Sequence, residues 1–294
     1  LFGKGHLGTG KKFHPTHHGY DVFAGFLEGG RPTRDAVLEI DGKDVQTDGF
    51  IVDVVTDLAL DFLKKQTAGK PFLISLHYRE PHAAWLPARD EDWLPYKNLD
   101  IVLPQPPHPE LSVDRVSRET REYYASVASV DRNVGRVLAA LDSAGFAENT
   151  IVVFTSDHGY HNGHHGLWFK GNAQWRTKTL PPQRWDNIPS KQRPNLFDQA
   201  LRVPTAIRWP NQIKPGSTVS QTVSNLDWFP TLLDVAGASA PESTVIRGHS
   251  ILPLLSGEQV EWDDNLYAEY SMRHGATTDM RAIRTPDWKL MIDF

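Results

Sequence analysis

The stretch TIVVFTSDHGYHNGHHG, residues 150–166, decides the fold. Its first seven residues are mostly apolar, uncharged and rich in β-branched side chains, which is typical of a buried strand. Asp157, His158 and Gly159 follow directly. In sheets of parallel strands, ligands gather at the carboxyl ends of the strands. The stretch therefore predicts a buried strand that delivers a carboxylate and an imidazole to a binding site.

Strand and helix patterns alternate on both sides of this stretch. Residues 71–78 (PFLISLHY) and 203–209 have the composition of strands, the first of them buried. Helical spacing of apolar residues covers 48–65 and a long segment that begins at Ser117 and ends at Gly145, and a third helix is expected over 226–236. The alternation predicts an α/β fold with a mostly parallel sheet flanked by helices.

Other segments mark the borders of these elements. Residues 104–109 form a Pro-rich loop, and residues 173–194, rich in Pro, Trp and basic side chains, have no periodicity and are expected to be an inserted surface loop. The chain starts within a Gly-rich loop and stops inside an apolar run. Because natural domains usually end in polar, loosely held residues, we expect an internal fragment.

Composition excludes several classes of protein. The 294 residues carry a formal net charge of −5 without any Lys/Arg-rich run, so we expect no nucleic-acid partner. There is no cysteine, which excludes disulfides and thiolate metal sites. No apolar run reaches the length of a membrane span, and the first residues lack the apolar segment of a signal peptide.

The ten residues DHGYHNGHHG contain four histidines, His158, His161, His164 and His165. Asp157 and His158 could both turn onto one divalent cation, since Gly159 lets the backbone bend sharply. A solvated His-rich turn explains the same pattern. Ca²⁺ and Mg²⁺ prefer several oxygen ligands, so a metal site would need further residues from elsewhere.

Further polar candidates lie in Gly-rich loops and after strands. Lys170, behind Trp168 and Phe169, could neutralise a bound oxyanion, although an ordinary surface lysine fits the spacing equally. Lys4 and His6 stand in GKGHLG, whose glycines allow close approach to a ligand. Three more candidates belong to the strand 71–78 and the segment after it: His82 near the carboxyl end, His77 as a hydrogen-bonded core or supporting residue, and Arg79 as partner of either Glu80 or a substrate anion.

Eight stretches, in order along the chain, resemble the type I sulfatases of the alkaline phosphatase superfamily. They are GKGHLG (3–8), FHPTHHGYDVFAGF (13–26), REPHAAWLP (79–87), the segment 123–159, HHGLWFKGN (164–172), NLFDQALRVPTAIRWP (195–210), NLDWFPTLLDVAG (225–237) and RGHSILPLLSG (247–257). The resemblance implies an alkaline-phosphatase-like catalytic domain over residues 1–260. It also implies the start of a smaller antiparallel subdomain over 261–294.

The resemblance also implies roles for six residues. Lys4 would contact sulfate and nucleophile, His6 would serve the nucleophile, and His82 would contact sulfate. Asp157 and His158 would bind a divalent cation, most often Ca²⁺ with Mg²⁺ as the alternative. Lys170 would approach the bridging oxygen of the ester. Gly5 stands where the family usually has Trp, a departure that leaves Lys4 and His6 in place.

Two elements of the family pattern are missing from the chain. These are an Asp-Asp pair that completes the metal site and a C/S-x-P-x-R motif whose Cys or Ser becomes the nucleophilic formylglycine. In the family both precede GKxHLG, so we expect them upstream and expect the chain alone to be inactive. In the implied mechanism, Lys4, Lys170 and the metal offset sulfate charge, His82 or Lys170 protonates the leaving oxygen, and His6 removes a proton to release sulfate.

The substrate is expected to be a small-molecule or carbohydrate sulfate ester. Trp85, Trp175 and Trp185 could stack on sugar rings, although tryptophans in loops also serve packing. A phosphomonoester or phosphonate-ester hydrolase of the same superfamily and a non-catalytic binding protein with this fold are the alternatives. By resemblance, the location is periplasmic or secreted.

Overall fold

The computed structural model describes residues 1–182 and 191–294, which divide into two units. The first unit comprises Leu1–Val102 and Ser117–Ala147, and the second comprises Leu103–Val116 and Glu148–Phe294. The chain thus passes between the two units three times, and each unit is built from two separate segments. Among the described residues, no helix is long and apolar enough to cross a membrane.

A five-stranded sheet forms the centre of the first unit. Its strands are β1 (Phe2–Lys4), β2 (Ala24–Phe26), β3 (Val37–Ile40), β4 (Lys43–Gln46) and β5 (Leu76–His77), in the order β4-β3-β2-β1-β5. β2, β1 and β5 are mutually parallel, whereas β3 and β4 add as antiparallel strands at one edge. Lys4 is the last residue of the central parallel strand, β1, and His6 lies just after it, as the α/β prediction requires.

Two glycines permit the close spacing of the parallel strands. A Cβ at Gly3, whose φ is +100°, would lie 2.0 Å from the His77 carbonyl oxygen, and a Cβ at Gly25 would lie 1.9 Å from the Gly3 carbonyl oxygen. No other residue fits either position, because a Cβ cannot approach backbone atoms so closely. These glycines therefore set the position of the strand that carries Lys4.

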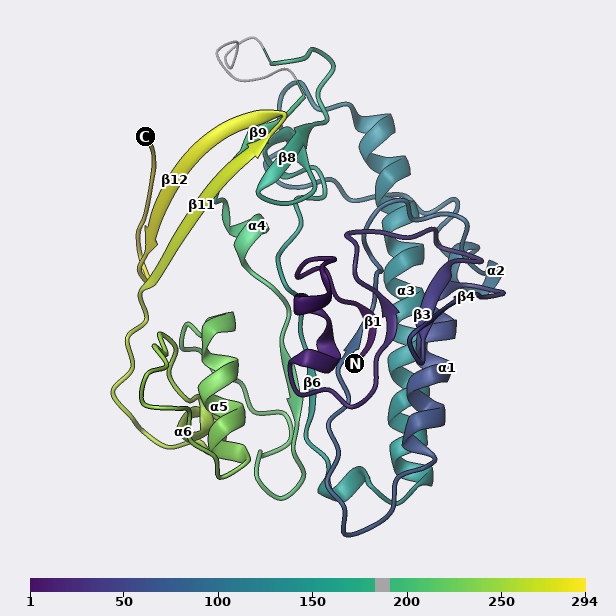
Figure 1. Cartoon of the computed structure of the whole chain (residues 1–294). Helices are drawn as coiled ribbons and strands as arrows, with labels where there is room; N and C mark the ends of the chain where they lie inside the picture. Colours follow the sequence, from purple (N-terminus) through teal and green to yellow (C-terminus); the bar gives the residue numbers. More distant parts are fainter. Residues whose placement is uncertain (183–190) are drawn as a thin grey trace. The chain divides into compact units, whose positions relative to one another are not determined.

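Helix α1 (Ile51–Leu63) covers the sheet and confirms the helix predicted over 48–65. Its buried residues Ile51, Val55 and Ala59 pack against residues of β1, β2 and β3 and form the core of the unit. The long helix α3 (Val113–Ser143) begins four residues before the predicted Ser117, and Gly145 follows its end with a φ of 73°. Residues 117–143 of α3 run beside α1 (Figure 1). The short helix α2 (Asp90–Trp93) contributes Asp92, which bonds α3.

A cluster of charged side chains joins these helices. Asp53 of α1 accepts hydrogen bonds from Arg132 (2.7 Å), Asn133 (2.9 Å) and Arg89 (2.6 Å), and Arg132 also binds Asp92 with two of its nitrogens. Burial alone would raise the pKa of Asp53, but these hydrogen bonds outweigh it and lower that pKa below its usual range. Asp53 is therefore an ionised structural residue.

The second unit consists of several small sheets with short helices between them. β6 (Val152–Phe154) pairs antiparallel with β10 (Ala206–Arg208); β7 (Leu167–Trp168), β8 (Asn172–Trp175) and β9 (Arg193–Pro194) form a second sheet; β11 (Leu266–His274), β12 (Ala276–Arg284) and β13 (Lys289–Asp293) form a third. The helices are α4 (Asp198–Leu201), α5 (Trp228–Val235) and α6 (Leu252–Ser256). The β11–β13 sheet confirms the antiparallel strands expected at the C-terminal end, and its curved hairpin is yellow in Figure 1.

Three expectations about strands and loops need correction. The strands predicted at 71–78 and 150–156 are only two and three residues long, and Leu73, Val153 and Phe154 are 66%, 38% and 41% exposed. The prediction of buried strands is thus wrong for this chain, since apolar composition favours a strand but only a covering layer buries it. The loop expected over 173–194 starts later, because β8 extends to Trp175; residues 183–190 lie outside the described part.

The tryptophans expected to stack on sugars are buried instead. Trp175 is 2% exposed and packs with Leu167 and Ala173, and Trp85 is 7% exposed. Side chains so enclosed serve packing, which corrects the expectation for these two residues. Trp185 lies outside the described residues.

Candidate functional site

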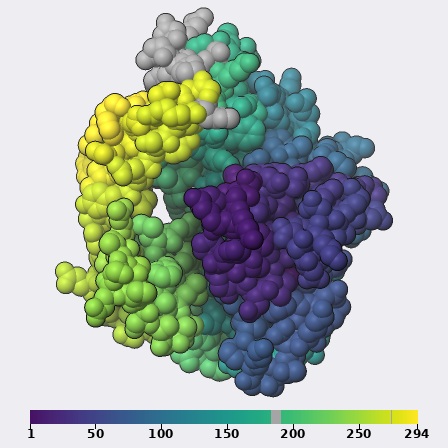
Figure 2. Space-filling model, viewed as in Figure 1, coloured from purple at the N-terminus to yellow at the C-terminus, as the bar shows by residue number. Residues whose placement is uncertain are grey.

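In the first unit, Lys4 ends β1 and the next residues turn around the end of β2. The Gly5 amide donates to the Phe26 carbonyl (2.8 Å) and the His6 amide donates to the Leu27 carbonyl (3.1 Å). His6 has a φ of 55°, in the left-handed region that few non-glycine residues adopt. Its side chain is exposed, and this N-terminal segment is the dark purple surface in Figure 2. The loop thus presents Lys4 and His6 at the carboxyl edge of the sheet.

His77 links the ends of two neighbouring strands. Its Nδ1 donates to the Lys4 carbonyl at 3.1 Å, so it holds the end of β5 against the end of β1. The residue was expected in the core or as a support, and it supports Lys4 while its own side chain is exposed. Of the two alternatives expected for His77, the structure shows the supporting residue and not the core residue, because β5 ends at His77 and the ring is exposed.

His82 stands in a loop after β5 that is closed by its own hydrogen bonds. The His82 amide donates to the Arg79 carbonyl (3.0 Å), Arg79 donates to the Ala84 carbonyl (3.0 Å), and the Trp85 indole donates to the Pro81 carbonyl (2.9 Å). His82 Nδ1 lies 2.7 Å from the Ala83 carbonyl, which only accepts, so this nitrogen carries the proton. Because β5 is parallel to β1, the loop starts at the same sheet edge as Lys4 and His6.

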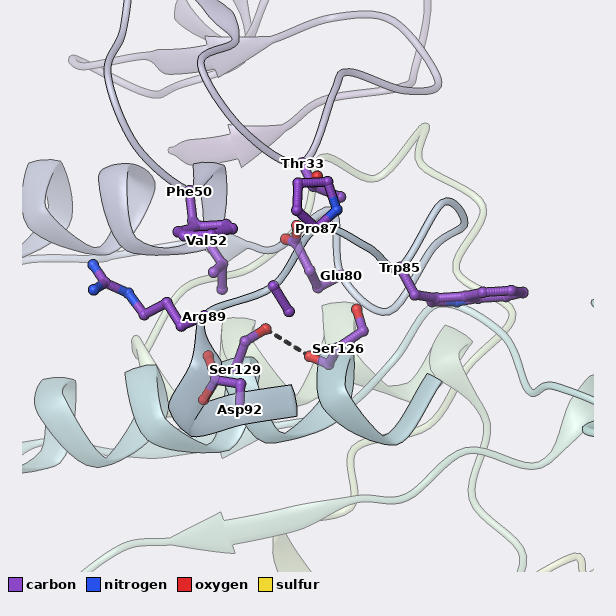
Figure 3. A pocket seen from close by; sticks show the side chains of 11 residues that line it. Thr33, Phe50, Val52, Glu80, Trp85, Pro87, Arg89, Asp92, Ser126 and Ser129 are labelled. Carbon is purple, nitrogen blue, oxygen red and sulfur yellow. Dashed lines mark hydrogen bonds between the residues drawn. The ribbon is translucent and has the colours of Figure 1, made fainter. Parts of the chain in front are cut away.

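The open choice for Arg79 is settled by the geometry: it pairs with Glu80. The two side chains are 4% and 5% exposed, and Arg79 Nη1 lies 3.6 Å from Glu80 Oε1. Burial raises the pKa of Glu80 to about 7, although the Arg79 charge opposes the shift. Glu80 also lines a small cavity with Thr33, Trp85, Asp92, Ser126 and Ser129 (Figure 3). Within the described part of the chain, Glu80 Oε2 and the Ser126 hydroxyl have no hydrogen-bond partner.

In the second unit, Asp157 and His158 follow β6 in a turn fixed by hydrogen bonds. Ser156 Oγ donates to the His158 carbonyl (3.0 Å). The side-chain nitrogen of Asn225 donates to the carbonyls of Ser156 (3.3 Å) and Asp157 (3.4 Å). His158 Nδ1 donates to the Gly159 carbonyl at 2.9 Å. His158 Nε2 lies 3.6 Å from Asp157 Oδ2. The turn thus brings a carboxylate oxygen and an imidazole nitrogen together.

This pair fits two positions of a divalent-cation site. A hard cation binds its ligand atoms at about 2.3–2.6 Å. Two ligand atoms on adjacent sides of one ion can therefore lie as far apart as Asp157 Oδ2 and His158 Nε2 do, which is 3.6 Å. Asp157 is well exposed, with its side chain 77% accessible. Across residues 1–182 and 191–294 no group of three or more carboxylate or imidazole ligands occurs. Asp157 and His158 fit the cation as a partial ligand set that other oxygens must complete.

Two further histidines of DHGYHNGHHG, His161 and His165, have partners of their own. His161 is fully buried and its Nε2 lies 3.1 Å from Asn195 Oδ1. Burial lowers its pKa to about 3, so the ring is neutral at ordinary pH. His165 stacks on Phe197 with ring centroids 4.2 Å apart and bonds Gln199. Buried packing explains His161, which sequence spacing alone does not separate from the metal candidates.

Lys170 is half-buried in the same unit. Burial lowers the pKa of its ammonium, while the Asp157 charge opposes the shift. Asn195 donates from its amide to the carbonyls of Lys170 (3.4 Å) and Gly171 (3.2 Å). Sequence reasoning missed Asn195, because an asparagine after a Pro-rich loop gives no local sign of its partners.

The structure therefore gathers the six predicted residues into two sets. Lys4, His6 and His82 lie at one sheet edge of the first unit, and Asp157, His158 and Lys170 lie in the second unit. Each set contains cationic or metal-binding groups suited to an oxyanion.

Comparison with known proteins defines the class. Residues 1–238 match the family model described as sulfatase, and residues 192–294 match the model for the C-terminal region of N-sulphoglucosamine sulphohydrolase. The chain belongs to the sulfatase family. It is 27% identical, over 85% of its length, to the N-acetylglucosamine-6-O-sulfatase of Bacteroides thetaiotaomicron.

Solved structures agree with the family. A structure in complex with its substrate D-glucosamine-2-N,6-O-disulfate has a TM-score of 0.80 at 24% identity and covers all of this chain and 71% of its own. A structure with a bound neocarrahexaose has a TM-score of 0.73 at 27% identity and covers 98% of this chain and 61% of its own. A phosphonate monoester hydrolase from Silicibacter pomeroyi has a lower TM-score, 0.58, and covers 86% of this chain and 55% of its own.

The chain is shorter than its relatives. It spans 55% of the length of the Bacteroides sulfatase and 20% of the mouse steryl-sulfatase, to which it is 38% identical over 46% of its own length. The chain thus matches only part of the length of these relatives.

Proposed function

We propose that this chain forms part of a sulfuric ester hydrolase that removes sulfate from a sulfated carbohydrate. The observation that carries the proposal is the pairing of Asp157 with His158 after β6, beside a half-buried cation, Lys170, in a chain of the sulfatase family. The sugar class is supported by the named N-acetylglucosamine-6-O-sulfatase relative and by the two structures with bound carbohydrate.

The proposed roles are those that the resemblance to the sulfatases implies, and the following observations support them. Lys4 and Lys170 offset the negative charge of the sulfate, which increases on the bridging oxygen as the sulfur–oxygen bond breaks. His82, whose Nδ1 proton is held by the Ala83 carbonyl, is oriented to contact sulfate through Nε2. His6 moves a proton at the nucleophile, and its exposed position leaves room for a neighbouring group.

Asp157 and His158 would hold the divalent cation, Ca²⁺ or Mg²⁺, with Asp157 Oδ2 and His158 Nε2 as the ligand atoms. Bound there, the cation would polarise a sulfate oxygen and offset its charge. The formylglycine nucleophile and the rest of the metal site are proposed to belong to an upstream segment. On this view the 294-residue chain alone has no turnover.

Phosphate and phosphonate esters are the second candidate class, because the same cations suit these oxyanions. The Silicibacter hydrolase shows that phosphonate esters are handled by a related fold. The TM-scores are higher for the two structures with bound carbohydrate, one of which holds a sulfated sugar as its substrate, and this favours sulfate.

The test compares Lys170→Ala with the parent in a chain extended by the upstream segment, on aryl sulfates with good and poor leaving groups. Loss of an electrostatic stabiliser costs about 10²–10³ in kcat, and we expect this loss on the poor leaving group with little change in KM. The exposed Lys214→Ala serves as control. Equal losses on both substrates would exclude the leaving-group role, and faster turnover of the matching phosphate or phosphonate esters would replace the sulfatase assignment.

A further inference from the structure

Asn195 is a buried residue whose side-chain amide donates to the backbone carbonyls of Gly171 and of Lys170, the residue proposed to meet the leaving group. It is 2% exposed. Its side-chain nitrogen donates to the carbonyls of Lys170 (3.4 Å), Gly171 (3.2 Å) and Arg193 (3.1 Å), and its backbone amide donates to Gly171 (2.9 Å). Its side-chain oxygen accepts from the Phe197 amide at 3.1 Å and lies 3.1 Å from His161 Nε2.

These partners fix both the amide and the histidine ring. Three carbonyls surround one end of the Asn195 side chain, and a backbone N–H points at the other end, so the nitrogen and oxygen cannot be exchanged. His161 Nε2 must then carry the proton and donate to Asn195 Oδ1. Burial of His161 holds the ring neutral, which agrees with a single proton on Nε2.

The backbone leading into Lys170 is held in an unfavourable conformation. Phe169 has a φ of 74°, which a bulky side chain rarely adopts and which other contacts must maintain. The His161 amide donates to the Phe169 carbonyl at 2.8 Å, on one side of Lys170. On the other side, Asn195 grips Gly171, and the Tyr270 ring packs where a Gly171 Cβ would be, within 3.0 Å. Residues 169–171 are therefore fixed from three directions.

We propose that Asn195, oriented by His161, is the positioning residue that holds Lys170 for the reaction. The inference rests on the proposed role of Lys170. Asparagine suits the position because one short side chain must donate to carbonyls and accept from two N–H groups at once. Aspartate keeps the acceptor contacts but loses the donors to Lys170 and Gly171, and alanine loses both.

The main experiment is a double-mutant cycle in the extended enzyme, with an aryl sulfate of poor leaving group as substrate. Asn195→Ala should lower kcat about 10- to 100-fold, less than loss of Lys170 itself, and leave KM nearly unchanged. If Asn195 acts through Lys170, adding Asn195→Ala to Lys170→Ala should give no further loss. Losses that multiply in the double variant would overturn the proposal.

Asn133→Ala provides the matched control. Asn133 is also fully buried and donates to Asp53 and to the Ser129 carbonyl, but it belongs to the first unit. Asn133→Ala should lower the stability of the protein, without the selective loss of kcat at unchanged KM that is expected of Asn195→Ala. A kcat loss like that of Asn195→Ala would assign the effect to general destabilisation and sink the positioning role. Where Asn195→Ala does not fold, Asn195→Asp takes its place, with the same expected cycle.

A second measurement separates this inference from the proposed function. Crystal structures of the 294-residue chain and of its Asn195 variant should show Phe169 relaxed to negative φ and Lys170 displaced in the variant. An unchanged 169–171 backbone would overturn the positioning role whatever the kinetics. Displacement of Lys170 together with full activity of Lys170→Ala would support the positioning of the backbone and refute the catalytic role of Lys170.

Discussion

Glu80 in the first unit and His161 in the second are both titratable side chains buried close to a proposed site residue. Glu80 precedes His82 by two residues and has one charged partner, Arg79. His161 is tied to the Lys170 segment through Asn195, an uncharged partner. Burial raises the pKa of Glu80 to about 7 and lowers that of His161 to about 3.

The difference follows from the sign of the charge that each group would carry. Burial disfavours the charged form, so an acid keeps its proton to higher pH and a base loses its proton at lower pH. Asp53 shows the third outcome, because several donors outweigh burial and keep that carboxylate ionised. Burial therefore predicts a neutral carboxyl group only where hydrogen-bond donors are few. The contributions of Glu80 and His161 to stability should change with pH in opposite directions.

The largest expected effect concerns His161 in acid. Its folded-state pKa of about 3 lies below the unfolded value of 6.5, so its contribution to stability is complete above pH 6.5 and is lost as the pH falls. The parent should lose about 1.4 kcal/mol per pH unit relative to His161→Leu, up to about 5 kcal/mol. Urea unfolding of both proteins between pH 7 and pH 4 measures the slope; parallel curves would contradict the buried neutral ring.

Asp53 is the charged counterpart of Glu80 and His161, because it is buried but stays ionised. Asp53→Ala leaves Arg132, Arg89 and Asn133 without their shared acceptor, and removing one partner of a buried ion pair typically costs about 3–5 kcal/mol. Asp57→Ala on the same helix removes a carboxylate that is 59% exposed, so it should change stability by less than about 1 kcal/mol. Denaturant midpoints of the two variants decide it, and similar losses would show that the cluster adds little.

Glu80 should give the opposite slope to His161. Its folded-state pKa of about 7 lies above the unfolded value of 4.5, so its contribution is complete below pH 4.5 and is lost as the pH rises through 7. The loss is at most about 3 kcal/mol, and Glu80→Gln should abolish it. The measurement is the stability difference between pH 5 and pH 8, and an equal difference in parent and variant would mean that Glu80 is ionised throughout.

The smallest expected effect is a gain in stability that does not depend on pH, from a substitution in the first unit. Gly135 is an exposed residue of α3 at which an added Cβ would meet no atom within 4 Å. Gly135→Ala should therefore stabilise the helix by about 0.5–1 kcal/mol, mainly by restricting the unfolded chain. Thermal unfolding should show the same gain at pH 5 and pH 8; a gain at one pH only would couple α3 to Glu80.

Sequence patterns predicted the features that depend on residues close together in the sequence. The helices near 48–65 and 117–145 were visible because apolar spacing is local, and residues at strand ends were visible because Asp157 and His82 directly follow strand-like runs. The exposure of β6 and its antiparallel pairing with β10 were not predicted, because the partner strand lies about fifty positions away in the chain. Asn195 was invisible for the same reason, since its partners lie at 161, 170 and 171.

The division into two units has a consequence for cutting and rejoining the chain. The chain passes between the units at 102–103, 116–117 and 147–148. A nick in the Pro-rich segment 104–109 would leave β1–β5 and α1 on one piece and α3 on the other. Asp53, Arg132 and Asn133 would still join α1 to α3 across the break. The first unit is thus built from two segments held together by side-chain contacts, and we expect the two pieces of the nicked chain to stay associated without a covalent link.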